Sequence, residues 1–408
     1  MPDRHRGKYG KIKRNTVKKW DDKTGCCGKC GKIGQDTVEK HGTMRKTGVE
    51  DDMNVFDFYR GKRVLVTGHT GFKGSWLCRM LLLAGAEVTG YALKPMEGGS
   101  LFELSGMADR MDSVEGDIRD LPHLKEVFEQ CRPEIVFHLA AQPLVRTSYE
   151  EPVRTYETNV MGTVHVLECA RTVPGVKSVL NVTTDKVYEN REWNWGYRET
   201  DPLDGYDPYS NSKSCSELVT HSYKKSFFGE LGIPVSTARA GNVIGGGDFA
   251  KDRIIPDCVR AAMGNRKIIL RNPDAIRPFQ HVLEPLYAYL MIAHQQMMDP
   301  GKQDYYNVGP TEQDCITVGR LTELFCEAWQ DGASFCCEKN DGPHEASFLK
   351  LDCSYIRGRI GWVPQWNIET AVQKTVEWTK VYQAGGDTGA CMDAQIRTYI
   401  SERREQSV

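Results

Sequence analysis

Residues 63–81 read RVLVTGHTGFKGSWLCRML, and this stretch decides the fold. The β-branched run at 63–67 predicts a strand, and apolar residues at helical spacing from Ser75 to Ala84 predict a helix. Between them, Gly68, Gly71 and Gly74 permit a tight turn that brings the backbone close to a pyrophosphate at the helix N-terminus, where free N–H groups attract anions. We interpret the stretch as the phosphate-binding turn of a dinucleotide-binding fold.

Strands and helices alternate from this turn as far as Arg239. Short apolar runs predict strands at 87–93, 135–139, 178–183 and 235–239, and helical spacing predicts helices at 124–131, 160–170 and 212–228. Strands that alternate with helices pair in parallel through right-handed crossovers. The predicted fold class is therefore α/β, with a doubly wound parallel Rossmann sheet.

The alternation ends after Gly241. Loops rich in glycine, proline and basic residues separate helices predicted at 257–264, 285–297, 318–329 and 368–383, which indicates a smaller, partly discontinuous C-terminal substrate lobe. We therefore divide the chain into four parts. They are a flexible basic extension (1–58), a cofactor-binding Rossmann domain (59–240 and 278–306), a substrate-binding lobe (241–277 and 307–385) and a C-terminal tail (386–408).

Charge and cysteine usage argue against several functions. Residues 1–50 carry 14 Lys/Arg and 6 Asp/Glu, so the formal net charge of −2 leaves about −10 on the rest, which does not suit a nucleic-acid partner. Most cysteines stand singly in apolar surroundings, as reduced cytoplasmic thiols do. We find no apolar segment of bilayer or signal-peptide length, and expect neither membrane insertion nor secretion.

Possible zinc ligands are Cys26, Cys27, Cys30 and His41, but with a single C-x-x-C motif we predict no metal.

Two groups of polar residues could carry chemistry. Tyr209 and Lys213 form Y-x-x-x-K, a spacing that puts both on one helix face. A lysine cation lowers the pKa of a neighbouring phenol, so that the phenolate can take a hydroxyl proton while hydride leaves for a nicotinamide. Thr184, Asp185 and Lys186 end a predicted strand at the carboxyl edge of the sheet, where ligands bind, and offer a hydroxyl, an acid and a base.

The residues that bind the adenosine end of the cofactor and the diphosphate of the substrate are less sharply defined. Lys94 stands where an acid usually binds the ribose 2′-hydroxyl and could instead accept a 2′-phosphate, so local chemistry leaves NAD and NADP open. Asp117 and Ile118, which lie between the strand predicted at 87–93 and the helix predicted at 124–131, are placed to meet the adenine. Arginines grip phosphate oxygens bidentately, so a cluster of them on the substrate side suggests a diphosphate. The polar residues that recur there are Asn242, Lys251, Arg253, Arg271 and Arg277.

Longer strings resemble the CDP-glucose 4,6-dehydratases of the extended short-chain dehydrogenase family. They are VTGHTGFKGSW (66–76), FHLAAQPLVR (137–146), NREW (190–193), GYDPYSNSK (205–213), AGNVIGGGD (240–248) and IRPFQHVLEP (276–285). The resemblance runs from about Gly61 to about Tyr382 and implies NAD and a homodimer or dimer of dimers. It adds Thr70, Phe72, Ala140 and Ala141 to the cofactor site, and Gln142 and His281 to the substrate site.

The resemblance also implies a reaction. Tyr209, supported by Lys213 and Thr184, would start oxidation at C4 of the sugar; the C5 proton then becomes acidic, and water leaves from C6 with Asp185 as proton donor. Lys186 stands where the dTDP-glucose branch has a glutamate, and would be the C5 base. The product would be CDP-4-keto-6-deoxyglucose, a precursor of deoxysugars in bacterial surface polysaccharides. Two alternatives stay open: an epimerase or dehydratase for another nucleotide sugar, and a non-catalytic NAD(P)-sensing Rossmann protein, which would not need these four ionisable residues together.

Overall fold

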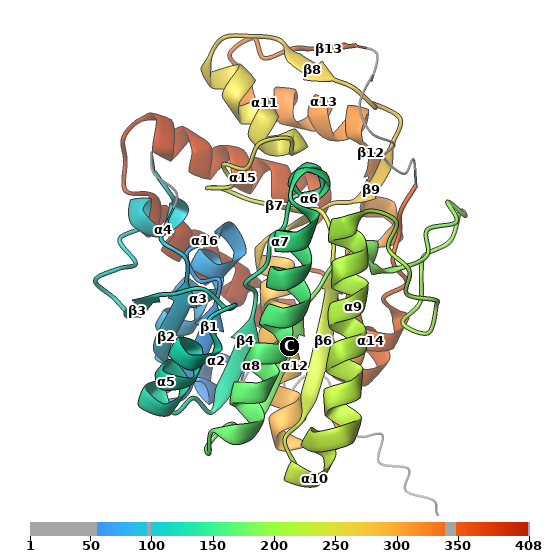
Figure 1. Cartoon of the computed structure of the whole chain (residues 1–408). Helices are drawn as coiled ribbons and strands as arrows, with labels where there is room; N and C mark the ends of the chain where they lie inside the picture. The colour runs from blue at the N-terminus through green and yellow to red at the C-terminus, as the bar shows by residue number, and fades with distance from the viewer. Residues whose placement is uncertain (1–54, 96–98, 339–347, 407–408) are drawn as a thin grey trace, which may run out of the picture. The chain divides into compact units, whose positions relative to one another are not determined.

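The structure is a computed structural model that describes residues 55–95, 99–338 and 348–406, all within one compact unit. Its centre is a seven-stranded parallel sheet in the order β11-β6-β5-β4-β1-β2-β3 (Figure 1). This order reverses between β1 and β4 and confirms the predicted doubly wound α/β fold. The strands are β1 (Arg63–Thr67), β2 (Glu87–Ala92), β3 (Asp112–Glu115), β4 (Ile135–His138), β5 (Ser178–Val182), β6 (Val235–Ala240) and β11 (Tyr305–Val308).

Helices cover both faces of the sheet because successive strand residues point to opposite sides. Val64 and Val66 of β1 share a core with α3 (Phe72–Leu83) and α12 (Leu283–Met298), whereas Leu65 lies in the other core with α5 (Leu121–Cys131) and α8 (Gly162–Thr172). The helix α9 (Pro208–Tyr223) lies beside α8 on this second face (Figure 1). Within the described ranges, no helix is long and apolar enough to cross a membrane.

A third core belongs to the smaller lobe, at the top of Figure 1. It joins α11 (Ile254–Met263), α13 (Val318–Trp329) and α15 (Ile368–Gln383), and three two-stranded sheets accompany it. The chain leaves this lobe to form α12 and β11 and then returns to it, which confirms that the lobe is discontinuous. The sheets pair β7 (Val243–Ile244) with β10 (Gln280–His281), β8 (Ile268–Leu270) with β13 (Phe335–Cys337), and β9 (Ile276–Pro278) with β12 (Cys315–Thr317).

Shorter elements connect these parts. They are α2 (Val55–Phe58), α4 (Leu101–Leu104), α6 (Val145–Glu150), α7 (Pro152–Tyr156), the π-helices η1 (Glu157–Met161) and η3 (Lys224–Phe228), the 3-10 turns η2 (Asp185–Val187), η4 (Pro300–Lys302) and η5 (Glu312–Asp314), α10 (Gly229–Leu231) and α14 (Ser354–Ile360).

Both ends of the described chain are more ordered than the sequence predicted. The predicted flexible extension is wrong for residues 55–58, because Val55 is buried in α2 and the following Tyr59 donates a hydrogen bond to Leu290 O at 2.8 Å. The predicted tail is largely the helix α16 (Thr388–Gln406), whose Met392 and Tyr399 are buried. Residues 1–54, with the candidate zinc ligands, lie outside the described residues.

Candidate active site

The glycine turn between β1 and α3 fits a dinucleotide. Gly68 has a φ of 76°, and a Cβ there would lie 2.7 Å from Ala140 N. A Cβ on Gly74 would lie 2.1 Å from Gly68 O, so neither position admits a side chain. Gly71 is the N-cap of α3 and supplies no capping side chain, which leaves the first-turn N–H groups of the helix for a phosphate.

The other predicted cofactor residues surround this turn at the carboxyl edge of the sheet. Thr70 Oγ1 donates to Leu93 O at 3.1 Å, and Ala140 N donates to Thr67 Oγ1 at 3.3 Å. These two bonds tie the turn to the ends of β2 and β4, with Ala141 next in the chain. Three further residues are Phe72, which lies against Gly245; Asp117, which forms an ion pair with Arg119 at 2.6 Å; and Ile118, which is buried against Gly162.

Helix α9 and the end of β5 bring the predicted catalytic residues together. Asp207 caps α9 by accepting a hydrogen bond from Ser210 N at 3.0 Å, and Lys213 Nζ donates to Val182 O at 3.1 Å. Thr184 Oγ1 donates to Asp185 Oδ1 at 3.0 Å and also shares a hydrogen bond with the Tyr209 phenol. A hydrogen-bonded chain therefore runs from Tyr209 through Thr184 to Asp185.

Burial sets the protonation of these groups. It raises the pKa of Tyr209 to about 12, while burial and then Lys73 lower the pKa of Lys213 to about 7. The prediction of a lowered tyrosine pKa is wrong for the protein alone, because removing the phenolate from water outweighs nearby positive charge. Burial also raises the pKa of Asp185, against the opposing effect of Lys186, its Thr184 hydrogen bond, Arg277 and Lys73.

Asp185 has the features of a general acid. The carboxyl is buried, and its Oδ2 has no hydrogen-bond partner among the described residues. A Cβ on Gly241 would lie 1.8 Å from Oδ2, so this glycine provides the space that the carboxyl occupies. A buried acid with an unsatisfied oxygen keeps its proton at a higher pH than an exposed one and can deliver it to a ligand.

Sequence reasoning missed Lys73. It is the second residue of α3, and its ammonium interacts with Asp185, Asp248 and Arg253. Burial and then Arg253 lower its pKa to about 8. The only signal in the sequence was that a charged residue lies between Gly71 and Gly74, where the geometry of the turn does not require a charge.

The substrate-side residues divide into two groups. In the first group, Arg253 Nη1 lies 2.9 Å from Asp248 Oδ2, and Arg271 lies 3.6 Å from Asp252. Asp252 also pairs at 3.1 Å with Arg146, an arginine that the sequence patterns did not single out. The remaining two predicted residues are Asn242 and Arg277. Asn242 has a φ of 37° and a buried Nδ2 without a partner in the described chain, and Arg277 acts electrostatically on Asp185.

Two predicted substrate residues are engaged elsewhere. The amide of Gln142 donates to Leu144 O and Thr155 Oγ1 and accepts from Leu144 N, so it holds its own loop. His281 has no exposed surface and packs edge-on against Trp76 and Trp366 in the core. Their assignment to the substrate stays a prediction, although the first side chain has used both its donors and the second is enclosed by indoles.

Comparisons with known proteins agree with this site. The family model for GDP-mannose 4,6 dehydratase matches residues 65–375. CDP-glucose 4,6-dehydratase of Salmonella typhimurium is 49% identical over 85% of this chain and 98% of its own, and a probable dTDP-glucose 4,6-dehydratase of Sinorhizobium fredii is 30% identical over 78% and 92%. The fold is similar to that of dTDP-glucose 4,6-dehydratase from Bacillus anthracis, solved with NAD (TM-score 0.67, 22% identity, 80% of this chain and 99% of that one). The chain therefore belongs to the family of nucleotide-sugar 4,6-dehydratases that the GDP-mannose 4,6 dehydratase model describes.

Proposed function

We propose that this chain is an NAD-dependent CDP-glucose 4,6-dehydratase, which converts CDP-D-glucose into CDP-4-keto-6-deoxy-D-glucose and water. The observation that carries the proposal is the hydrogen-bonded chain Tyr209–Thr184–Asp185, which ends in a buried carboxyl. Oxidation at C4 needs a base such as Tyr209, but only an elimination needs an acid beside it. An epimerase has no use for that acid.

The chain's residues have distinct roles in this reaction. Tyr209 Oη takes the proton of the C4 hydroxyl, with Thr184 orienting the phenol and Lys213 supplying positive charge behind it. Lys186 takes the C5 proton, and Asp185 gives its proton to the departing C6 hydroxyl, which leaves as water. When bound, NAD would supply the acceptor for the hydride from C4 and the hydride for C6. Lys186 then gives its proton back to C5, and the proton taken by Tyr209 restores Asp185. The turn with Gly68, Gly71 and Gly74 would hold the diphosphate of NAD.

Two observations support the choice of CDP-glucose. The relative named for CDP-glucose is 49% identical to this chain, against 30% for the one named for dTDP-glucose. The resemblance described above also implies that Lys186 stands where the dTDP-glucose branch has a glutamate. Asn242, Arg253, Arg271 and Arg277 supply the donors for the CDP diphosphate and sugar. We assign cofactor binding to 59–240 and 278–306, and substrate binding to 241–277 and 307–385, with the sheet continuing through β11.

The assembly and setting are part of the same proposal. Val153, Met161 and Leu218 expose apolar side chains on α7, η1 and α9, which supports a homodimer, or a dimer of dimers, built on this face. The cysteines of the described residues are free thiols, which supports a cytoplasmic enzyme. We place its product in the synthesis of deoxysugars for O-antigen, without nucleic acid or membrane as partners.

A product analysis tests the proposal. The protein with NAD is incubated separately with CDP-glucose, dTDP-glucose and GDP-mannose, and the products are weighed by mass spectrometry. We expect a product lighter by one water from CDP-glucose alone. A product of unchanged mass would indicate an epimerase, loss of water from another nucleotide sugar would change the substrate, and no product at all would favour a NAD-sensing protein.

A further inference from the structure

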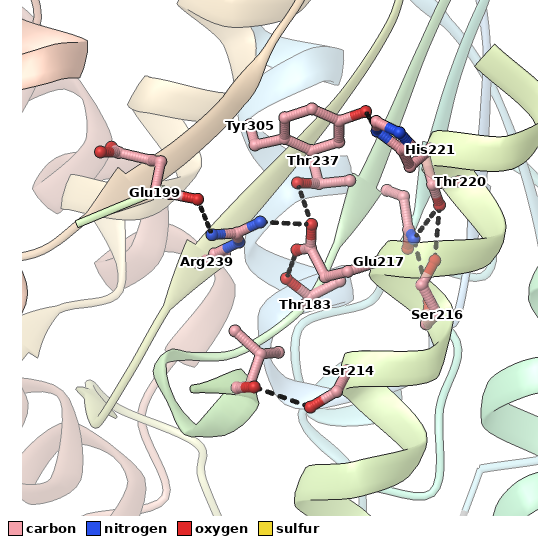
Figure 2. Close-up of polar contacts among 12 residues, drawn as sticks. Thr183, Glu199, Ser214, Ser216, Glu217, Thr220, His221, Thr237, Arg239 and Tyr305 are labelled. Carbon is pink, nitrogen blue, oxygen red and sulfur yellow. Dashed lines mark hydrogen bonds and ion pairs between the residues drawn. The ribbon is translucent and has the colours of Figure 1, made fainter. Parts of the chain in front are cut away.

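A buried ion pair lies one helical turn beyond Lys213. Glu217 and Arg239 have side chains that are 1% and 3% exposed, and Glu217 Oε2 accepts from Arg239 Nη2 at 2.9 Å. The same carboxylate accepts from Thr237 Oγ1 at 2.8 Å and from Thr183 Oγ1 (Figure 2). Glu217 thus bonds α9 to the end of β5 and to β6, the two strands beneath the catalytic helix.

Arg239 depends on Glu217 for its charge balance. Its Nη1 donates to the neutral groups Tyr188 Oη at 2.8 Å and Glu199 O at 3.1 Å. Within the described residues, Glu217 is the carboxylate that pairs with it. Removing one partner of a buried pair leaves a charge without compensation, which is far costlier than removing an exposed one.

The negative charge of Glu217 acts directly on Lys213. Residues four apart on a helix share a face, so Glu217 lies next to Lys213 on α9. The other ionisable neighbours of Lys213 do not supply negative charge: Lys73 of α3 is a cation, and burial keeps His138 of β4 and Tyr209 of α9 neutral, with the pKa of His138 lowered to about 3. Burial and Lys73 lower the pKa of Lys213, and Glu217 opposes them.

We propose that Glu217 is a positioning residue for the reaction: its carboxylate, held by Thr183, Thr237 and Arg239, fixes α9 on the sheet and keeps Lys213 in the ammonium form. This inference rests on the proposed function, in which Lys213 supplies positive charge to the phenol of Tyr209. Glu217 reaches the substrate only through these two residues.

The first test is the pH profile of kcat/KM with CDP-glucose for wild type, Glu217→Gln, Glu217→Asp and Thr237→Val. Loss of the buried negative charge weakens proton binding at both Lys213 and Tyr209, so both limbs of the Glu217→Gln profile should move to lower pH by about one unit, within the Coulomb energy of two charges about 6 Å apart. Glu217→Asp keeps the charge and should keep the limbs. Thr237→Val removes a bond to the same carboxylate without its charge and serves as the structural control.

The second test needs no turnover. The pKa of Lys213 in the folded protein, about 7, lies below its unfolded value, so burying this lysine costs stability in full below pH 7, and the cost disappears as the pH rises towards the unfolded value. In Glu217→Gln the pKa of Lys213 in the folded protein falls further. The loss of stability caused by burying its ammonium therefore keeps growing as the pH falls below 7. If that pKa falls by about one unit, the loss in the unfolding equilibrium relative to wild type should be about tenfold larger at pH 5 than at pH 9. Glu199 titrates near pH 7 close to Arg239, so both proteins carry Glu199→Gln.

The outcomes separate an electrostatic role of Glu217 from a merely structural one. They also separate a failure of this inference from a failure of the proposed function. Unmoved limbs together with a pH-independent loss of stability would make Glu217 merely structural and overturn the inference. A wild type that does not dehydrate CDP-glucose would refute the proposed function, while the stability comparison would still decide the role of Glu217. If Glu217→Gln does not fold, Glu217→Gln combined with Arg239→Met removes both charges, and its limbs should move in the same direction by a smaller amount.

Discussion

Replacing Asp185 with asparagine should lower catalysis and raise stability at the same time. Asparagine has the same size, and its Oδ1 can accept the hydrogen bond that Thr184 gives at 3.0 Å, so the site keeps its shape. What is lost is the acidic proton for the departing C6 hydroxyl. Loss of a general acid typically costs about 10²- to 10⁴-fold in rate, or roughly 3 to 5 kcal/mol of activation free energy.

The gain in stability follows from the buried carboxyl. Burial raises the pKa of Asp185 above its unfolded value, so the protonated form supports the fold at low pH, and this support is lost as the pH rises through the folded pKa. Asparagine has no charge to bury. The free energy of unfolding of the variant should therefore rise relative to wild type between pH 4 and pH 8, by on the order of 1 kcal/mol, or about 2 °C in Tm.

Two measurements check the predicted loss of rate and the predicted gain in stability. Product formation from CDP-glucose is followed by mass spectrometry in deuterated water, and thermal unfolding is recorded at pH 5 and pH 8. Asp185→Asn should stop dehydration but still let solvent deuterium enter at C5, because the C5 proton goes to another group. A variant with more than about a tenth of the wild-type rate, or with a lower Tm than wild type at pH 8, would refute the role of Asp185.

Three further predictions concern the base, the C5 proton and the N-terminal boundary. Tyr209→Phe should lower kcat at least 100-fold, while calorimetry should find CDP-glucose affinity within a factor of about two of wild type; a smaller loss of rate would exclude Tyr209 as the base. Lys186→Ala should prevent deuterium from entering C5, and free exchange would assign the base to another residue. A chain that begins at residue 60 should have a free energy of unfolding about 3 kcal/mol below that of a chain that begins at Val55, because it lacks the buried Val55 and Tyr59; equal Tm values would contradict this packing.

The sheet and the catalytic pairings could be predicted because their signals are local. The β-branched run of β1 gave its bounds to the residue, and the helices at 318–329 and 368–383 agree with α13 and α15 at both ends. Tyr209 and Lys213 could be paired from their spacing on one helix. Each of these inferences needs only neighbours along the chain.

The remaining features depend on contacts that the local pattern does not contain. His281 was assigned to the substrate because it lies in a string typical of the family, yet Trp76 and Trp366, from distant segments, enclose it. The pKa of Tyr209 was expected to fall, but its direction depends on how dry the folded site is. The seventh strand, Tyr305–Val308, was missed because a run of only four residues is too short to show the alternation that marks a strand.

The ion pair between α3 and α16 has a consequence for the order in which the protein can be completed on the ribosome. Arg79 is 4% exposed, and its Nε and Nη2 donate to the two oxygens of Asp393 at 2.6 and 2.8 Å, across 314 positions of sequence. Until that aspartate emerges, the helix after the glycine turn carries a guanidinium that the rest of the Rossmann domain cannot neutralise. The first βα unit is therefore complete only when α16 has docked, and we expect a chain truncated before Asp393 to leave the cofactor-binding half without this ion pair.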